Sequence, residues 1–174
     1  HNYSLIAFAA ALEPLRLANQ VSEREVYRWS CHSLYGEPVA ASNGLTTQPD
    51  GPLDTIENAD MVVVCAGLNV ERQQHPKALL ARLRFLASRG TTIGAICTGA
   101  HVLAKAGLLD GRRCTIHWES LQGFKEEFPN LEITSELFEF DNRRMTSAGG
   151  TASLDMMLHY LATHHGADLA TSVA

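Results

Sequence analysis

The sequence predicts an α/β fold in which helices cover both faces of a mostly parallel sheet. Residues 61–65 are apolar without interruption, and the run at residues 92–96 is short and partly β-branched, as is typical of strands buried on both faces. Between them, apolar residues at helical spacing follow Pro76 and continue to Gly90. Alternating strands and helices favour parallel pairing, because each helical crossover returns the chain to the same edge of the sheet.

The N-terminal part of the chain predicts a helix, a strand and a turn. The helix begins after Ser4, a suitable N-cap, and Pro14 should bend it or end its first part. Its apolar positions keep helical spacing: Leu5, Phe8, Leu12 and Leu15. Residues 26–34 alternate as a strand does, and turn residues at 42–44 precede a short extended segment at 45–48.

The C-terminal part repeats the alternation in shorter elements. A short strand at residues 113–116 ends at His117, and a helix follows from Trp118 until Pro129. A last helix opens after the glycines that precede Thr151, and its pattern continues to the end of the chain. Three further strands and one hairpin turn are expected between these helices, at residues 131–133, 137–140 and 144–146, with the turn at Asp141-Asn142.

The composition predicts one globular domain with an acidic net charge. Of the 174 residues, 45% are hydrophobic and 19% are charged, which suffices for a substantial core. The formal net charge of −5 argues against this chain binding nucleic acid by itself. No apolar run approaches membrane-span length, and no signal peptide is recognisable, so we expect a domain over residues 1–174 with no membrane partner.

The cysteines and histidines predict neither a disulfide framework nor a metal site. The four cysteines are scattered without a C-x-x-C pair, which fits a reducing compartment: Cys31, Cys65, Cys97 and Cys114. Three histidines gather near the C-terminus, but no carboxylate joins them at ligand spacing: His159, His164 and His165. We interpret them as solvated helix-end residues, and we expect no metal and no cofactor.

The most informative stretch runs from Thr92 to Ala106, where a buried strand passes without a loop into a helix. Cys97 stands at the junction among small residues, and such a corner forces its residue into a strained backbone. The helix start directs free N–H groups at this position, which favours an anion or a thiolate there. The pattern predicts a nucleophile elbow that carries cysteine, with a buried structural cysteine as the alternative.

Other strand ends could complete a site around Cys97. We expect His117 to end the next strand of the parallel sheet, so that its side chain converges with the thiol as a base or cation. The backbone N–H of Gly67, at another strand end, could serve an oxyanion hole. His117 could instead contact an effector or cap a helix, and Trp118 could line a pocket or pack in the core. His101, one helical turn after Cys97, is expected to pack away from the cleft.

Several motifs together resemble a known family. They are Ala95-Ile-Cys-Thr-Gly-Ala100, Ala106-Gly-Leu-Leu-Asp-Gly111, His117-Trp118-Glu119, Thr146-Ser-Ala-Gly-Gly-Thr151 and Ala11-Leu-Glu-Pro-Leu-Arg16. Their order and extent are similar to the class I glutamine amidotransferase-like (PfpI-type) domain, in the version fused to an AraC-type DNA-binding domain in bacterial regulators. The resemblance implies a flavodoxin-like three-layer sandwich with a small β-hairpin, usually dimeric. It also implies a first strand upstream of His1 and a helix-turn-helix domain after Ala174.

For function, the resemblance implies an effector-sensing domain of a cytoplasmic transcriptional regulator. Catalytic relatives carry an acidic residue early in the first helix that approaches the cysteine, and the matching position here is Ala7. We therefore expect no enzyme of that type. A free-standing cysteine-dependent amidase or hydratase remains the alternative, and a thiol redox sensor using Cys97 is a third reading.

The expected effector is a small amine-derived metabolite such as glycine betaine, carnitine or arginine. A quaternary ammonium favours aromatic faces and a nearby carboxylate, which Tyr3, Trp118 and Glu13 or Glu119 could supply. We expect a homodimer that contacts DNA only through the C-terminal domain. The candidate ligand-binding residues are Asn2, Tyr3, Glu13, Gly67, Leu68, Cys97, Thr98, His117, Trp118 and Gly149, with Cys97 and His117 as vestigial catalytic candidates.

Overall fold

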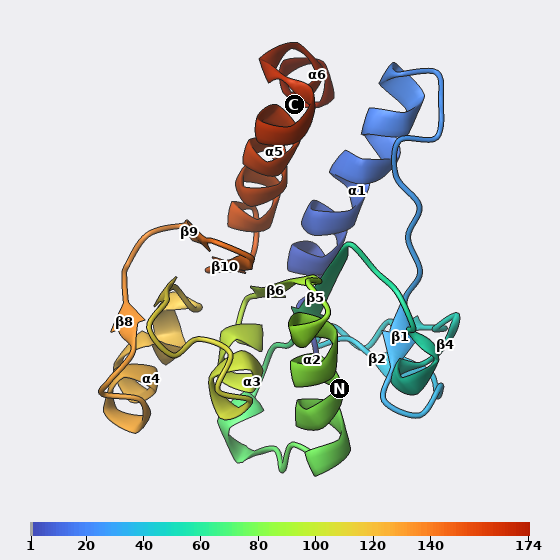
Figure 1. Cartoon of the computed structure of the whole chain (residues 1–174). Helices are drawn as coiled ribbons and strands as arrows, with labels where there is room; N and C mark the ends of the chain where they lie inside the picture. Colours follow the sequence, from blue (N-terminus) through green and yellow to red (C-terminus); the bar gives the residue numbers. More distant parts are fainter. Residues whose placement is uncertain (1) are drawn as a thin grey trace.

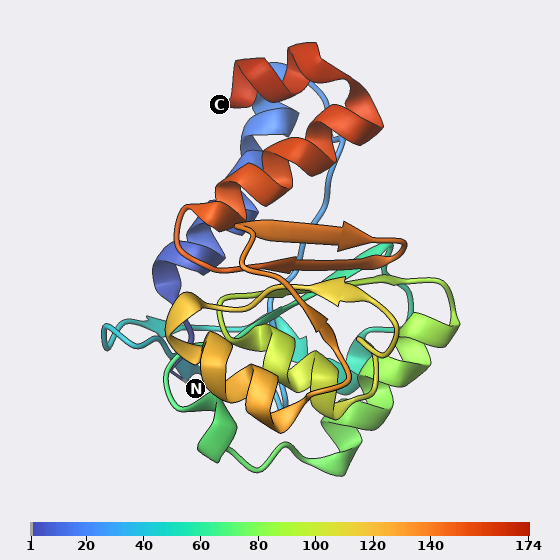
Figure 2. The ribbon, with the colours of Figure 1, turned by 90° about the vertical axis from the view of Figure 1, so that its left-hand side faces the viewer.

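A computed structural model of the chain describes residues 2–174 and places a four-stranded sheet between two layers of helices (Figures 1 and 2). The strand order is β5-β6-β10-β9, with bounds Met61–Cys65, Thr92–Ile96, Arg144–Ser147 and Phe138–Asp141. The first three strands are parallel and β9 is antiparallel to β10. Ile96 pairs with both Cys65 and Ser147, so the three parallel strands end at the same level.

One face of the sheet is covered by α2 (Lys77–Ser88), α3 (Gly99–Lys105) and α4 (Leu121–Glu127) (Figure 1). Their apolar side chains form the largest core cluster together with β6. Its fully buried members include Leu83, Leu86, Ile93, Leu103 and Leu109. This burial follows from the helical spacing of apolar residues in α2 and from the absence of charged residues in β5 and β6.

The opposite face is covered by α1 (Leu5–Val21) and α5 (Ala152–His165), which pack side by side. Small residues at Ala7, Ala11 and Ala18 form the buried stripe of α1. Figure 2 shows that these helices continue beyond the sheet, where α6 (Ala167–Val173) joins them. A separate apolar cluster holds that extension together: Ala18, Leu161, Ala170 and Val173.

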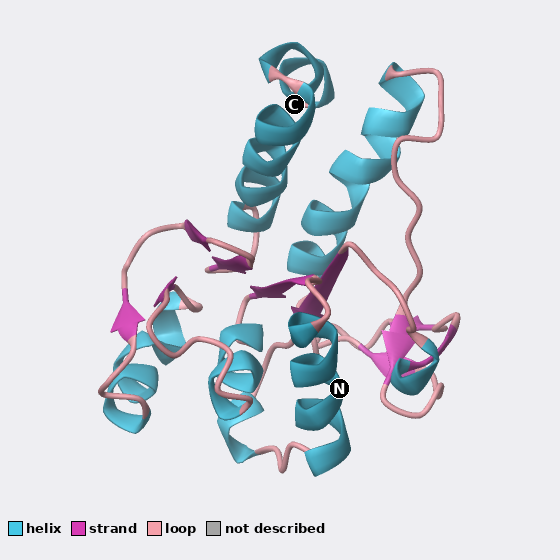
Figure 3. Cartoon of the chain, in the orientation of Figure 1, coloured by secondary structure: helices cyan, strands magenta, loops and turns pink. Residues whose placement is uncertain are grey.

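Short strands and turns surround this framework (Figure 3). Three two-stranded sheets consist of β1 (His32–Ser33) with β4 (Gly51–Pro52), β2 (Val39–Ala40) with β3 (Thr46–Thr47), and β7 (Arg113–Cys114) with β8 (Glu132–Ile133). The β2–β3 pair is the small antiparallel hairpin around the turn expected at residues 42–44. Single 3-10 turns follow at Leu53–Thr55 (η1), Val70–Arg72 (η2) and Trp118–Ser120 (η3). No described helix is long and apolar enough to cross a membrane.

The expected fold class is confirmed, and two local expectations are wrong. The expected strand at residues 26–34 shrinks to β1, because the side-chain amide of Asn19 takes the backbone bonds of Val26 and Tyr27. Of the two expectations for Pro14, an end of the first helix is excluded, because α1 continues through Pro14, which lies on its buried stripe. The last helix is divided at Gly166, whose φ of 92° ends α5 before α6 begins.

Candidate functional site

Cys97 occupies the corner between β6 and α3. Its φ of 58° places a non-glycine residue in the left-handed region, and the residue is 7% exposed. The Cys97 corner has room in the fold because the residue packed against it is Gly149. A Cβ on Gly149 would stand 2.8 Å from the Cys97 Cβ. The elbow geometry predicted from the sequence is therefore confirmed.

His117 lies beside Cys97, although not by the expected route. Its backbone N–H donates to the Cys97 carbonyl at 3.2 Å. The neighbours of β6 in the sheet are β5 and β10, so the expectation that β7 pairs with β6 is wrong. The loop after β7 instead brings His117 to the corner. The His117 Nδ1 stands 3.6 Å from a carboxylate oxygen of Glu119.

The end of β5 joins the same edge of the sheet through backbone contacts. The Asn2 carbonyl accepts a hydrogen bond from the Leu68 N–H at 3.1 Å, and a Cβ on Gly67 would stand 2.1 Å from that carbonyl oxygen. Only glycine at position 67 allows this approach. The Thr98 hydroxyl donates to the Gly67 carbonyl at 2.7 Å and links this segment to the Cys97 corner.

The larger candidate side chains differ in where they lie. The Tyr3 ring is buried, and its hydroxyl is hydrogen-bonded to that of Thr47. Trp118 is 73% exposed, next to the His117 ring. Glu13 lies on the exposed side of α1 and pairs with Arg16 at 2.7 Å. Exposed aromatic surface beside the corner therefore comes from Trp118.

Burial dominates the electrostatics at the corner. It raises the pKa of the Cys97 thiol above its usual value, and the Glu119 carboxylate acts in the same direction, whereas the Thr98 N–H lowers it. The N–H groups at the helix start act in the expected direction and lower the pKa of the thiol, but burial outweighs them. On the α1 side, Ala7 and Ala11 pack in the same cluster as Cys97, and Ala7 is fully buried.

A cavity of about 270 Å³ is lined in part by Ile116 and Glu119, the residues that flank His117-Trp118 in the sequence. Its lining includes Glu119 together with Glu71, Glu127, His101 and the ring of Phe124, over an apolar base of Val70 and Ile116. Only Glu119 and His101 among these residues are singled out by the sequence motifs. Val70 and Glu71 come from η2, Phe124 and Glu127 from α4, and Ile116 from the loop after β7, and no motif links η2 or α4 to the Cys97 pattern.

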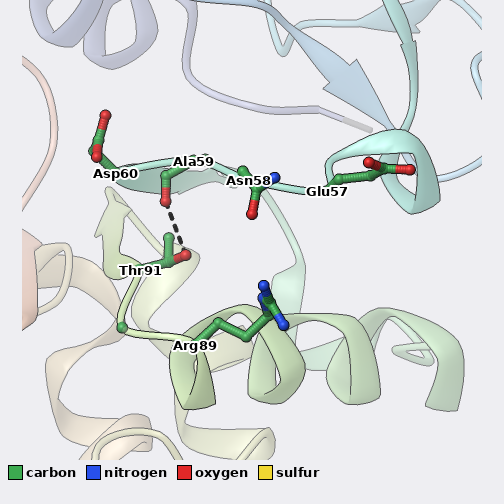
Figure 4. A pocket seen from close by; sticks show the side chains of 7 residues that line it. Glu57, Asn58, Ala59, Asp60, Arg89 and Thr91 are labelled. Atoms are coloured by element: carbon green, nitrogen blue, oxygen red, sulfur yellow. Dashed lines mark hydrogen bonds between the residues drawn. The ribbon is translucent and has the colours of Figure 1, made fainter.

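A second cavity, of about 340 Å³, lies at the opposite edge of the sheet, before β5 and β6 begin (Figure 4). It is lined by Glu57, Asn58, Ala59, Asp60, Arg89, Gly90 and Thr91. The Thr91 hydroxyl donates to the Ala59 carbonyl at 2.9 Å, so this polar group is already used within the fold. Ligands of parallel α/β sheets bind at the carboxyl ends of the strands, which makes the Cys97 edge the stronger candidate.

The C-terminal histidines lie against aromatic rings. His159 contacts Phe138 and Phe140, and His164 stacks on Tyr160 at a centroid distance of 4.0 Å. Among residues 2–174, no group of three or more His, Cys, Asp or Glu side chains could hold a metal ion. His101 is buried with Phe124 and Phe128, which confirms that it packs away from Cys97.

Comparisons with known proteins agree with this geometry. The family model described as DJ-1/PfpI family matches residues 10–163. The chain is 48% identical over 172 residues to the HTH-type transcriptional regulator CdhR of Pseudomonas aeruginosa, covering 99% of this chain and 51% of that protein. It is 45% identical over 176 residues to the HTH-type transcriptional regulator GbdR of the same species, covering 99% and 47%.

A solved structure is also similar over nearly the whole chain. The crystal structure of an AraC family transcriptional regulator from Pseudomonas putida has a TM-score of 0.90 at 28% identity, covering 99% of this chain and 92% of that chain. The chain spans about half the length of the curated relatives just described.

Proposed function

Because this chain belongs to the DJ-1/PfpI family, we propose that it is the effector-sensing domain of an AraC-family transcriptional regulator. Its relatives at 45% and 48% identity are HTH-type regulators about twice as long, which supports a DNA-binding domain elsewhere in the protein. In this proposal, residues 1–174 bind a small molecule at the carboxyl end of the sheet.

The lining of the Cys97 corner carries this proposal. Methyl groups of Ala7 and Ala11 pack on the α1 side, where a catalytic relative would carry its carboxylate. The raised pKa of Cys97 keeps the residue a neutral thiol near pH 7. A neutral, enclosed thiol is a poor nucleophile, so the corner serves to shape a binding site.

We propose a small amine-derived zwitterion as the effector, with glycine betaine, carnitine and arginine as the first compounds to test. The exposed ring of Trp118 and the carboxylate of Glu119 offer a cation both an aromatic face and a negative charge. The proposed binding set keeps Asn2, Gly67, Leu68, Thr98, His117 and Gly149, which the fold gathers at one edge of the sheet. Tyr3 is buried next to this edge through its backbone bridge to Gly67. Glu13 stays in the proposed set, although its carboxylate pairs with Arg16 on the exposed side of α1.

Binding would be transmitted through a homodimer to the DNA-binding domain. The effector can shift the equilibrium between two dimer geometries only if it prefers one of them. The helical extension formed by α1, α5 and α6 lies beyond the sheet and is a suitable element for such coupling (Figure 2).

A cysteine-dependent amidase or hydratase is the second candidate function. The left-handed backbone of Cys97 favours it, because such a corner is the backbone of a nucleophile elbow, and the backbone hydrogen bond from His117 keeps a candidate base on the neighbouring segment. The two candidates differ in whether the thiol reacts transiently with the bound compound and converts it or only lines the site that binds it.

Isothermal titration calorimetry with the three compounds separates the candidates. We expect binding by the wild type and by Cys97→Ala, and about tenfold weaker binding by Glu119→Gln, the loss of one partly solvated charge contact. Glu57→Gln, which changes a carboxylate in the opposite cavity, is the matched control and should bind normally. No heat from any compound would remove this effector class. Binding lost in Cys97→Ala, or a compound consumed over time, would favour the enzyme.

A further inference from the structure

The segment that follows the site's Leu68 is held against α3 and α4 by a histidine pair. This segment, residues 69–76, contains η2 and leads into α2. Val70 inserts into the large core cluster, and the His75 ring lies over the His101 ring at a centroid distance of 5.6 Å. His101 is only 3% exposed, so few polar groups can contact its ring nitrogens, and His75 supplies one of them.

The distances define a hydrogen-bonded chain of three groups. The His101 Nε2 stands 2.8 Å from a Glu127 carboxylate oxygen, and the His101 Nδ1 stands 3.4 Å from the His75 Nε2. A carboxylate only accepts, so His101 must donate through Nε2. The remaining contact, between His101 and His75, requires one nitrogen to donate and the other to accept.

Counting protons shows how many the chain can hold. With both imidazoles neutral, the His75 N–H donates to the His101 Nδ1. With one added proton in the pair, one facing nitrogen still carries hydrogen and donates, and the facing nitrogen of the neutral ring accepts. With two added protons, both facing nitrogens carry hydrogen, and two positive rings oppose each other at 3.4 Å. The contact survives the first proton and fails with the second.

The surrounding charges do not compensate for a second proton. Glu127 faces the pair from α4, but Lys105 of α3 already pairs with its other oxygen. Glu71 and Glu119 line the adjoining cavity with His101. Phe124 and Phe128 cover the rest of the His101 ring, and apolar rings do not solvate a charge. Burial, then His101 and Lys105, lower the pKa of His75 against the opposing effect of Glu127.

We propose that His75 and His101 form a proton-controlled latch, which holds residues 69–76 on α3 at neutral pH and releases them when both imidazoles are protonated. A histidine pKa that is lowered in the docked state means that the released state binds more protons. Docking is therefore strongest above the ordinary histidine pKa of about 6.5 and weakens as the pH falls below it. Release would loosen the segment next to Leu68, and the latch does not depend on the proposed regulator function.

Hydrogen exchange of residues 69–76 in the full-length protein tests the latch. Exchange rates are measured by mass spectrometry near pH 7.5 and pH 5.5 and corrected for the intrinsic pH dependence of amide exchange. In the wild type we expect about tenfold faster corrected exchange at the lower pH, the effect of one titrating group over one pH unit. In His75→Gln, which keeps an N–H donor but cannot be protonated, the two corrected rates should agree.

His164→Gln is the matched control, because His164 is a histidine stacked on Tyr160 outside the latch. It should keep the wild-type response. A wild-type segment whose corrected exchange is the same at both pH values would overturn the proposal. A His75→Gln segment that responds to pH as strongly as the wild type would do so as well, because the response would then come from other groups.

Discussion

Cys97, just before α3, and His101, in the first turn of α3, differ sharply in their surroundings although they lie only four positions apart. At the start of the helix, Cys97 is enclosed by the methyl groups of Ala7 and Ala11 and by the backbone of Gly149. One turn later, His101 is joined to a carboxylate and a second imidazole, with Lys105 beside them. The Cys97 corner has the backbone of a catalytic elbow, with His117 and Glu119 nearby, whereas His101 contacts its titratable partners directly through its ring nitrogens.

This difference shows that backbone strain and reactive chemistry are separable. The left-handed conformation of Cys97 follows from the direct passage of β6 into α3, whatever the side chain does. Reactivity needs a base or a cation that stabilises the thiolate, and burial acts against this. A residue can therefore keep the corner conformation whether or not its thiol is reactive.

The largest effect is expected when an acidic side chain is introduced at position 7, which packs in the same cluster as Cys97. Ala7→Glu would bury a carboxylate at a fully buried position, and we expect a loss of about 3–5 kcal/mol near pH 7. Burial raises the pKa of such an acid, so the penalty should shrink below about pH 4 and grow as the pH rises. Urea unfolding over this pH range, with Ala7→Gln as the uncharged control, measures it. Equal stability of the two variants near pH 7 would show that the corner already accommodates an acid.

The second effect tests the packing of the corner. Gly149→Ala places a Cβ within 2.8 Å of the Cys97 Cβ at a φ of 91°, and we expect about 2–4 kcal/mol of destabilisation. Gly150→Ala is the control, because Gly150 also has a positive φ of 57° but no atom near its Cβ position. It should cost about 1 kcal/mol, the strain alone. Similar losses in both variants would mean that contact with Cys97 contributes nothing.

The sequence predicts the framework well because burial there is dictated by pattern. The strand at Met61–Cys65 and the helix that ends before Gly90 appear as expected, since continuous or helically spaced apolar residues have few other ways to leave water. Residues 26–34 have a comparable alternation, but the amide of Asn19 captures their backbone. Hydrogen bonds from a side chain seven or eight positions away do not alter the spacing of apolar residues, so that spacing does not reveal them.

The site is only partly predictable for a related reason. Cys97 and Gly149 are marked by local strain and small residues, which a sequence displays. The approach of His117 depends on a loop, and the sheet order behind it was predicted wrongly. Glu127 and His75 meet His101 only through packing of α4 and the η2 segment, and no spacing rule connects those three residues.

A third, smaller effect concerns the rate at which the Cys97 thiol reacts with an alkylating reagent. Its raised pKa leaves less thiolate near pH 7.5 than an ordinary cysteine has, so iodoacetamide should label it about tenfold or more slowly than in the unfolded protein. The labelling rate should rise only above about pH 9, as the thiol ionises. Peptide mass spectrometry reports the site, with urea-unfolded protein as the control. Rapid labelling with an inflection below about pH 8 would reopen the enzyme and redox-sensor readings.

The smallest effect concerns Glu127 of α4, which pairs with His101 and Lys105 of α3. Burial raises the pKa of Glu127, but hydrogen bonds from Lys105 and His101 outweigh it and hold the pKa below its usual value. An acid with a lowered pKa stabilises the fold above its unfolded pKa of about 4.3, and this contribution is lost as the pH falls further. Since Glu127 is partly exposed, we expect Glu127→Gln to cost only about 0.5–1 kcal/mol near pH 7 and almost nothing below about pH 3. Glu126→Gln, on the exposed side of the same helix, should change stability by less than about 0.3 kcal/mol at either pH. A Glu127→Gln loss that persists unchanged in acid would mean that shape, and not charge, joins α4 to His101.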